Sequence, residues 1–195
     1  MRAMPLVLAV VCLLATPAPS DAGPSPAPAA AHAAHRVRPR DPIAALLLRF
    51  GTEKSARFRE VVRALERSNV IVYVEVRQES AHPVSGGLTF IGEAHGVRWV
   101  RAMVDSGTPS HIRTCQDIVR LTSILGHELQ HALEASQAPT MRDVVEFERY
   151  FRSIGIAREP KVLDTMAARQ TGKRVADELR GMGRPRGAVA SASTN

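Results

Sequence analysis

The chain has 195 residues, of which 45% are hydrophobic and 23% are charged. This balance is typical of a soluble globular protein, and the length fits one domain with flanking segments. The excess of basic residues gives a net charge of +7. Nucleic acid could attract such a charge, but no run of basic residues and no recognisable binding module marks the folded region, so we expect no nucleic-acid partner.

Residues 1–22 have the order of a secretory signal peptide. Arg2 supplies a positive charge, Leu6–Ala15 is an apolar run, and small residues follow as far as Ala22. The run is too short to span a bilayer, so we expect no stable membrane span. Removal of this segment would leave Cys115 as the only cysteine, which excludes an internal disulfide. The sequence therefore predicts a secreted or periplasmic protein.

Composition divides the rest of the chain into three parts. A linker rich in proline and alanine covers 23–40, and a single folded domain covers 41–181. A tail rich in glycine, alanine and serine covers 182–195 and is expected to be disordered. Neither flanking composition can build a core.

The folded domain is predicted to begin with two helices. Asp41–Pro42 is a typical helix start, and Ile43–Phe50 has the pattern of a short helix that ends at Gly51. A second amphipathic helix is expected from Thr52 to about Asn69.

Three β-strands are predicted next. Val70–Val76 is rich in β-branched residues and has the pattern of a buried strand. Leu88–Ile91 and Val97–Val104 follow it, separated by a turn that contains two glycines. An antiparallel meander is the simplest arrangement of three consecutive strands.

The remainder of the domain is predicted to be helical. Thr114–Ser136 is the longest helical stretch, and further helices are expected over Thr140–Phe151 and from Val162 or Asp164 to Leu179. One face of the long helix is apolar at helical spacing. Its members are Ile118, Leu121, Leu125, Leu129 and Ala132. The predicted fold class is therefore α+β, with a small antiparallel sheet followed by a long helix and further C-terminal helices.

The long helix carries the motif H-E-x-x-H at His127, Glu128 and His131. Four residues along a helix place the two imidazoles about 40° apart and one turn apart. Both rings can therefore reach one zinc ion, while Glu128 lies on the neighbouring face. Zinc lowers the pKa of a bound water, and a carboxylate so placed can accept the proton.

The segment Leu125–Glu134, with the sequence LGHELQHALE, resembles the active-site helix of zincin metallopeptidases. The resemblance is closest to small, exported, gluzincin-like bacterial proteins. It implies a zincin-like fold, a zinc cofactor, and a peptide or protein substrate. In zincins the last strand before this helix borders the cleft and pairs with the substrate backbone, which implies that role for Val97–Val104.

A third protein ligand is needed to complete a zinc site. Gluzincins often supply it as E-x-x-A-D on a downstream helix, and Asp164 followed by Ala167 resembles that pattern with Asp in place of Glu. Glu148 and Glu146 are alternative ligands, and Asp164 could instead be a helix N-cap. Glu134 is poorly placed to reach the same ion and could support the site or be a surface charge.

The predicted activity is zinc-dependent hydrolysis of peptide bonds, with zinc bound by His127, His131 and Asp164 and with Glu128 as general base. Alternatives are a non-catalytic, zincin-like binding or scaffold protein of the cell envelope, and a basic protein that binds polyanions. An oxyanion stabiliser is expected across the cleft. The residues available for it are Tyr150, Arg98, Arg101, His95 and His111.

Overall fold

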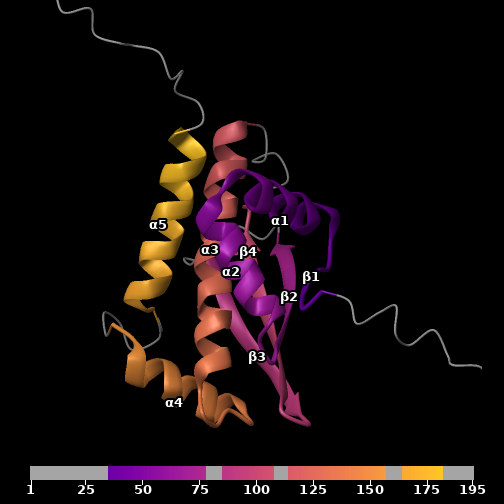
Figure 1. Cartoon of the computed structure of the whole chain (residues 1–195), viewed down its shortest axis with the longest axis vertical. Helices are drawn as coiled ribbons and strands as arrows, with labels where there is room; N and C mark the ends of the chain where they lie inside the picture. The colour runs from indigo at the N-terminus through magenta and orange to yellow at the C-terminus, as the bar shows by residue number, and fades with distance from the viewer. Residues whose placement is uncertain (1–34, 78–84, 108–113, 157–163, 182–195) are drawn as a thin grey trace, which may run out of the picture. The chain divides into compact units, whose positions relative to one another are not determined.

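The computed structural model describes residues 35–77, 85–107, 114–156 and 164–181. The predicted signal peptide, the predicted tail and His111 lie outside these residues, as does most of the predicted linker. Within them the chain is α+β, as predicted, with four strands and five helices (Figure 1). None of the described helices is both long enough and apolar enough to cross a membrane.

The elements follow one another with short connections. In chain order they are β1 (Val37–Pro39), α1 (Pro42–Lys54), α2 (Ala56–Glu66), β2 (Val70–Arg77), β3 (Gly86–Ala94), β4 (Val97–Asp105), α3 (Cys115–Gln137), α4 (Val144–Ile154) and α5 (Met166–Gly181).

Helix α1 starts as predicted but continues past Gly51. Asp41 caps it by accepting a hydrogen bond from the Ala44 amide, and the helix ends at Ser55, which also caps α2. A Cβ atom at Gly51 would lie 2.7 Å from the ring of Phe58. Glycine at this position therefore lets α1 and α2 pack closely and does not end the helix.

The sheet is mixed, so the predicted antiparallel meander is wrong. The strand order is β1-β2-β4-β3, in which β2 is parallel to β1 and to β4, and only β3 is antiparallel to its neighbour. His95 and Gly96 both have positive φ, as a two-residue hairpin turn between β3 and β4 requires. This hairpin places β3 on one edge of β4 and leaves the other edge to β2. Hydrophobic alternation is the same for either order, so the sequence pattern could not distinguish them.

Strand β1 was not predicted. It pairs with β2 in parallel, with Val37 beside Val72, and the Arg36 amide donates to the Glu66 carboxylate at 2.7 Å. Three residues next to a proline- and alanine-rich stretch are too short to show a strand pattern. The folded part therefore begins before Asp41, inside the segment assigned to the linker.

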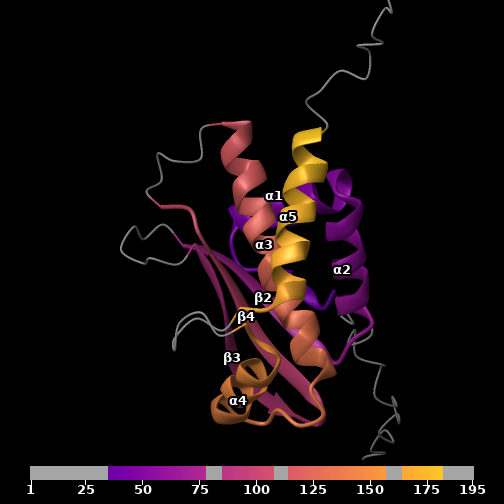
Figure 2. The same cartoon turned by 90° about the vertical axis from the view of Figure 1, so that its left-hand side faces the viewer.

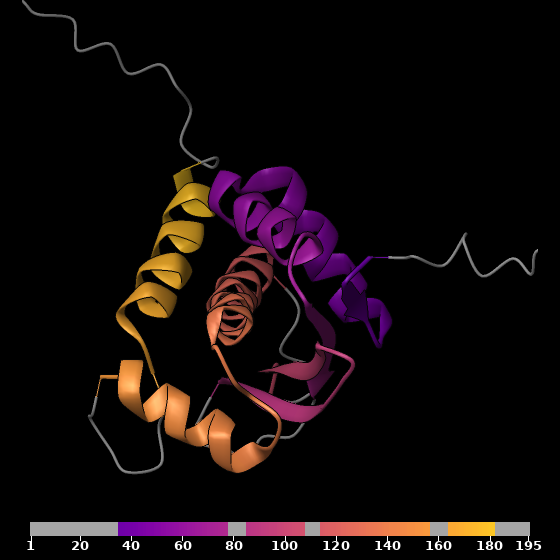
Figure 3. The same cartoon turned by 60° about the horizontal axis from the view of Figure 1, so that its bottom comes forward.

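Helix α3 is the central element of the fold (Figures 2 and 3). Thr114 and Asp117 form a capping box at its start, close to the predicted position. The predicted apolar face packs into the core, with Leu121, Leu125 and Leu129 fully buried. The sheet lies on one side of α3 and α5 on another, so side chains from α3 can meet residues from both.

The end of α3 is held by Arg98 of β4. This side chain is buried, and its guanidinium donates to the backbone carbonyls of Ala135 at 2.7 Å and Ala138 at 2.8 Å. Carbonyls at a helix C-terminus have no partner within the helix and carry partial negative charge, so they stabilise a buried cation. Arg98 is thus a structural residue and is not available as an oxyanion stabiliser.

Arg98→Ala is expected to lower the free energy of unfolding by about 2–4 kcal/mol, because it leaves buried carbonyls without donors. Arg101→Ala is the matched control on the same strand, since its side chain is 41% exposed and lies 3.7 Å from Glu75. That change should cost less than about 1 kcal/mol. Urea denaturation measures both values, and equal values would contradict the structural role of Arg98.

Candidate metal centre

The two motif histidines meet on one side of α3, as the four-residue spacing predicts. Their Nε2 atoms lie 3.1 Å apart. The His127 side chain is 24% exposed and the His131 side chain 6% exposed, so the pair is open to solvent mainly at His127. Burial lowers the pKa of His127, and the neighbouring His131 lowers it further. Both effects favour the neutral imidazole, which is the form that binds metal.

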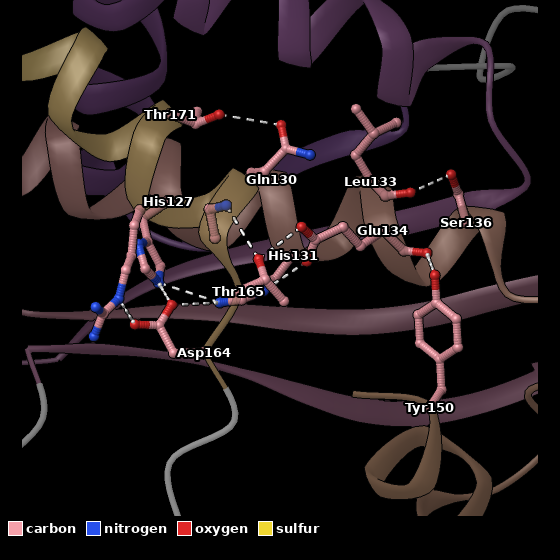
Figure 4. Close-up of polar contacts among 12 residues, drawn as sticks. His127, Gln130, His131, Leu133, Glu134, Ser136, Tyr150, Asp164, Thr165 and Thr171 are labelled. Atoms are coloured by element: carbon pink, nitrogen blue, oxygen red, sulfur yellow. Dashed lines mark hydrogen bonds and ion pairs between the residues drawn. The ribbon is translucent and has the colours of Figure 1, made fainter. Parts of the chain in front are cut away.

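Asp164 lies beside this pair, two residues before α5 begins (Figure 4). Its Oδ1 atom is 3.4 Å from Nε2 of His127 and 3.8 Å from Nε2 of His131. The other oxygen, Oδ2, accepts a hydrogen bond from Nε of Arg169. Oδ1 is buried and has no hydrogen-bond donor among the described residues. A buried carboxylate oxygen without a donor is costly unless a cation occupies the space that it faces.

Asp164 is not the N-cap of α5, so that alternative is wrong. Thr165 has this role, because its Oγ1 accepts from the Ala168 amide at 3.1 Å. The carboxylate of Asp164 is consequently left to face α3. Close packing of the two helices brings it there, since a Cβ atom at Gly172 would lie 3.2 Å from Cβ of His127.

Glu134 is buried beneath the site and is not a surface charge. Its Oε2 lies 2.9 Å from Nδ1 of His131, and its Oε1 accepts from Oγ1 of Thr165 at 2.7 Å. A carboxylate on Nδ1 holds the proton at that nitrogen and leaves the Nε2 lone pair free. Tyr150 donates to the backbone carbonyl of Glu134 at 3.1 Å and so faces away from the histidine pair.

The arrangement fits a zinc ion. Two imidazole nitrogens and one carboxylate oxygen form a ligand set that zinc accepts, with a fourth position left for water. Bonds of 2.0–2.1 Å in a tetrahedron put ligand atoms about 3.3 Å apart. The observed separations of 3.1, 3.4 and 3.8 Å lie around that value.

No family model, curated protein or solved structure matches this chain.

Glu128 extends from α3 toward the sheet. It is 5% exposed, and a Cβ atom at Gly86 of β3 would lie 2.7 Å from its Oε1. No described residue donates a hydrogen bond to the carboxylate. Burial raises the pKa of Glu128 to about 7, with Asp164 adding to the rise and His131 opposing it. A carboxyl with these properties is suited to exchange a proton near neutral pH.

The other candidates from the sequence lie elsewhere. Glu146 and Glu148 are on α4, where they bond to the Arg142 amide and to the Arg152 side chain. His95 is in the β3–β4 turn and Arg101 pairs with Glu75. Arg169, five residues after Asp164, was not predicted, and its basic side chain on the predicted last helix is the one signal in the sequence that points to it.

Glu128→Gln is expected to stabilise the metal-free protein at about pH 8 by about 2–3 kcal/mol. The pKa of Glu128 is about 7 in the folded protein and 4.5 in an ordinary carboxyl group. Ionisation of Glu128 therefore lowers the free energy of unfolding as the pH rises through 7. Glutamine cannot ionise and avoids this loss. Urea unfolding with a chelator at about pH 4 and pH 8 measures the difference. Glu148→Gln on α4 is the control, and an equal effect of both changes would show that burial of Glu128 is not the cause.

Proposed function

We propose that this protein is a zincin-like, zinc-dependent hydrolase that cleaves peptide bonds. The observation that carries the proposal is the buried Oδ1 of Asp164, which lacks a donor in the described structure and faces Nε2 of both His127 and His131. Zinc bound by these residues would supply a Lewis acid that acidifies a neighbouring water and polarises a carbonyl group.

Each residue of the chain has a distinct task in this proposal. His127, His131 and Asp164 bind the ion, and Glu134 orients His131 through Nδ1. Glu128 accepts a proton from the attacking water and returns it to the leaving amine. Its carboxylate is available for this task because no described residue donates a hydrogen bond to it.

A peptide substrate is supported by the position of β3. The expectation that β4 would pair with the substrate is wrong, because β2 and β3 occupy both of its edges. Among the described strands β3 pairs only with β4, so its other edge can accept an extended peptide. Gly86 at the start of β3 lies against Glu128, which would bring such a peptide past the proposed base. Export through a signal peptide remains part of the proposal.

Asp164→Asn is expected to weaken zinc binding by at least about 100-fold, because it removes a charged ligand and keeps the shape of the side chain. Competition with a chromophoric chelator measures the affinity. Glu148→Gln, a change at the alternative ligand, should leave the affinity unchanged. Tight zinc binding by the Asp164→Asn protein would exclude Asp164 as a ligand.

Glu128→Gln is expected to reduce peptide hydrolysis by at least about 100-fold while one zinc per chain is retained. The probe is a mixture of unstructured synthetic peptides, with new termini detected by mass spectrometry and zinc measured in the same samples. Full activity in this variant would refute the mechanism. Zinc binding without any cleavage by the unsubstituted protein would instead support a non-catalytic zincin-like protein.

A further inference from the structure

Arg169 lies at the edge of the candidate metal centre. It is the fourth residue of α5, and its Nε donates to Oδ2 of Asp164, the oxygen that is turned away from the two histidines. The Arg169 side chain is 35% exposed. It therefore extends from the ligand Asp164 toward solvent.

Among the described residues, only one nitrogen of the Arg169 guanidinium has a partner. No described residue bonds to either Nη atom, and neither is among the buried polar atoms that lack a hydrogen bond. Both Nη atoms are therefore accessible to solvent. Arg57 provides a contrast, because its nitrogens bond to Thr171, Gln130 and Glu60 and tie α2 to α3 and α5.

Arg169 brings to an otherwise acidic site a positive charge and two N–H groups that have no partner among the described residues. Asp164, Glu128 and Glu134 bring three carboxyl groups to the site, and in the described part of the chain Arg169 is the cationic side chain that pairs with Asp164. The two Nη atoms present parallel N–H donors, which match the two oxygens of a carboxylate. A single oxyanion would use only one of them.

We propose that the free Nη edge of Arg169 binds a carboxylate of the substrate next to the metal centre. The substrate class is then a peptide with a carboxylate close to the bond that is cleaved. Either the free C-terminus or an acidic side chain can supply this group. The inference rests on the proposed function and adds a substrate preference to it.

The test measures binding, so that it does not depend on turnover. Zinc-loaded Glu128→Gln protein is titrated calorimetrically with acetyl-Ala-Ala-Ala and with its C-terminal amide. A second pair of probes, acetyl-Ala-Asp-Ala amide and acetyl-Ala-Asn-Ala amide, tests an acidic side chain. For at least one pair, the affinity of the carboxylate probe should exceed that of its neutral partner by about tenfold or more. The pair that shows the preference identifies the source of the carboxylate.

The same titrations are repeated after substitution of Arg169. The preference should disappear with Arg169→Gln. It should persist in part with Arg169→Lys, which keeps the positive charge but loses the two parallel N–H donors of the guanidinium. Arg180→Gln, an exposed position three turns further along α5, should keep the full preference.

Two outcomes would overturn the proposal. If Arg169 only positions Asp164, Arg169→Gln will weaken both members of a pair equally and leave their ratio unchanged. If the protein that retains Arg169 prefers the carboxylate in neither pair of probes, or binds no probe at all, the substrate assignment is wrong. Zinc affinity measured on the same proteins shows separately whether the metal centre itself has failed.

Discussion

The close packing of α5 against α3 determines where the candidate metal centre forms. Gly126 on α3 and Gly172 on α5 leave so little space that an added Cβ would lie 3.1 Å from Val175 and 3.2 Å from His127, respectively. Because the helices approach this closely, Asp164, two residues before α5, is placed beside the turn of α3 that carries both histidines. The position of Asp164 thus follows from helix packing.

Thr165 links this packing to the orientation of His131. Its hydroxyl accepts from the Ala168 amide and donates to Glu134, whose other oxygen contacts Nδ1 of His131. Thr165 therefore caps α5 and also holds the Glu134 carboxylate, which keeps the proton of His131 on Nδ1. A shift at the start of α5 would disturb both His131 and the neighbouring Asp164.

Among the described strands, the mixed sheet leaves β3 as one of its two edge strands. The β3–β4 hairpin places β4 in the interior of the sheet, between β2 and β3, and leaves β3 at the margin next to Glu128. The edge strand next to Glu128 is therefore the first strand of the hairpin. Strand patterns identify which residues are extended, but they carry no information on which edges are shared.

The sequence alone determined the α+β composition, the extent of β2, β4 and α3, and the spacing that brings His127 and His131 together. These features depend on local periodicity and caps, which neighbouring residues specify. Only the tertiary structure decided the strand order, the approach of Asp164 to the histidine pair in place of Glu146 or Glu148, and the position of Arg169. Those depend on contacts between segments far apart in the chain, where several carboxylates have suitable chemistry and only packing selects one of them.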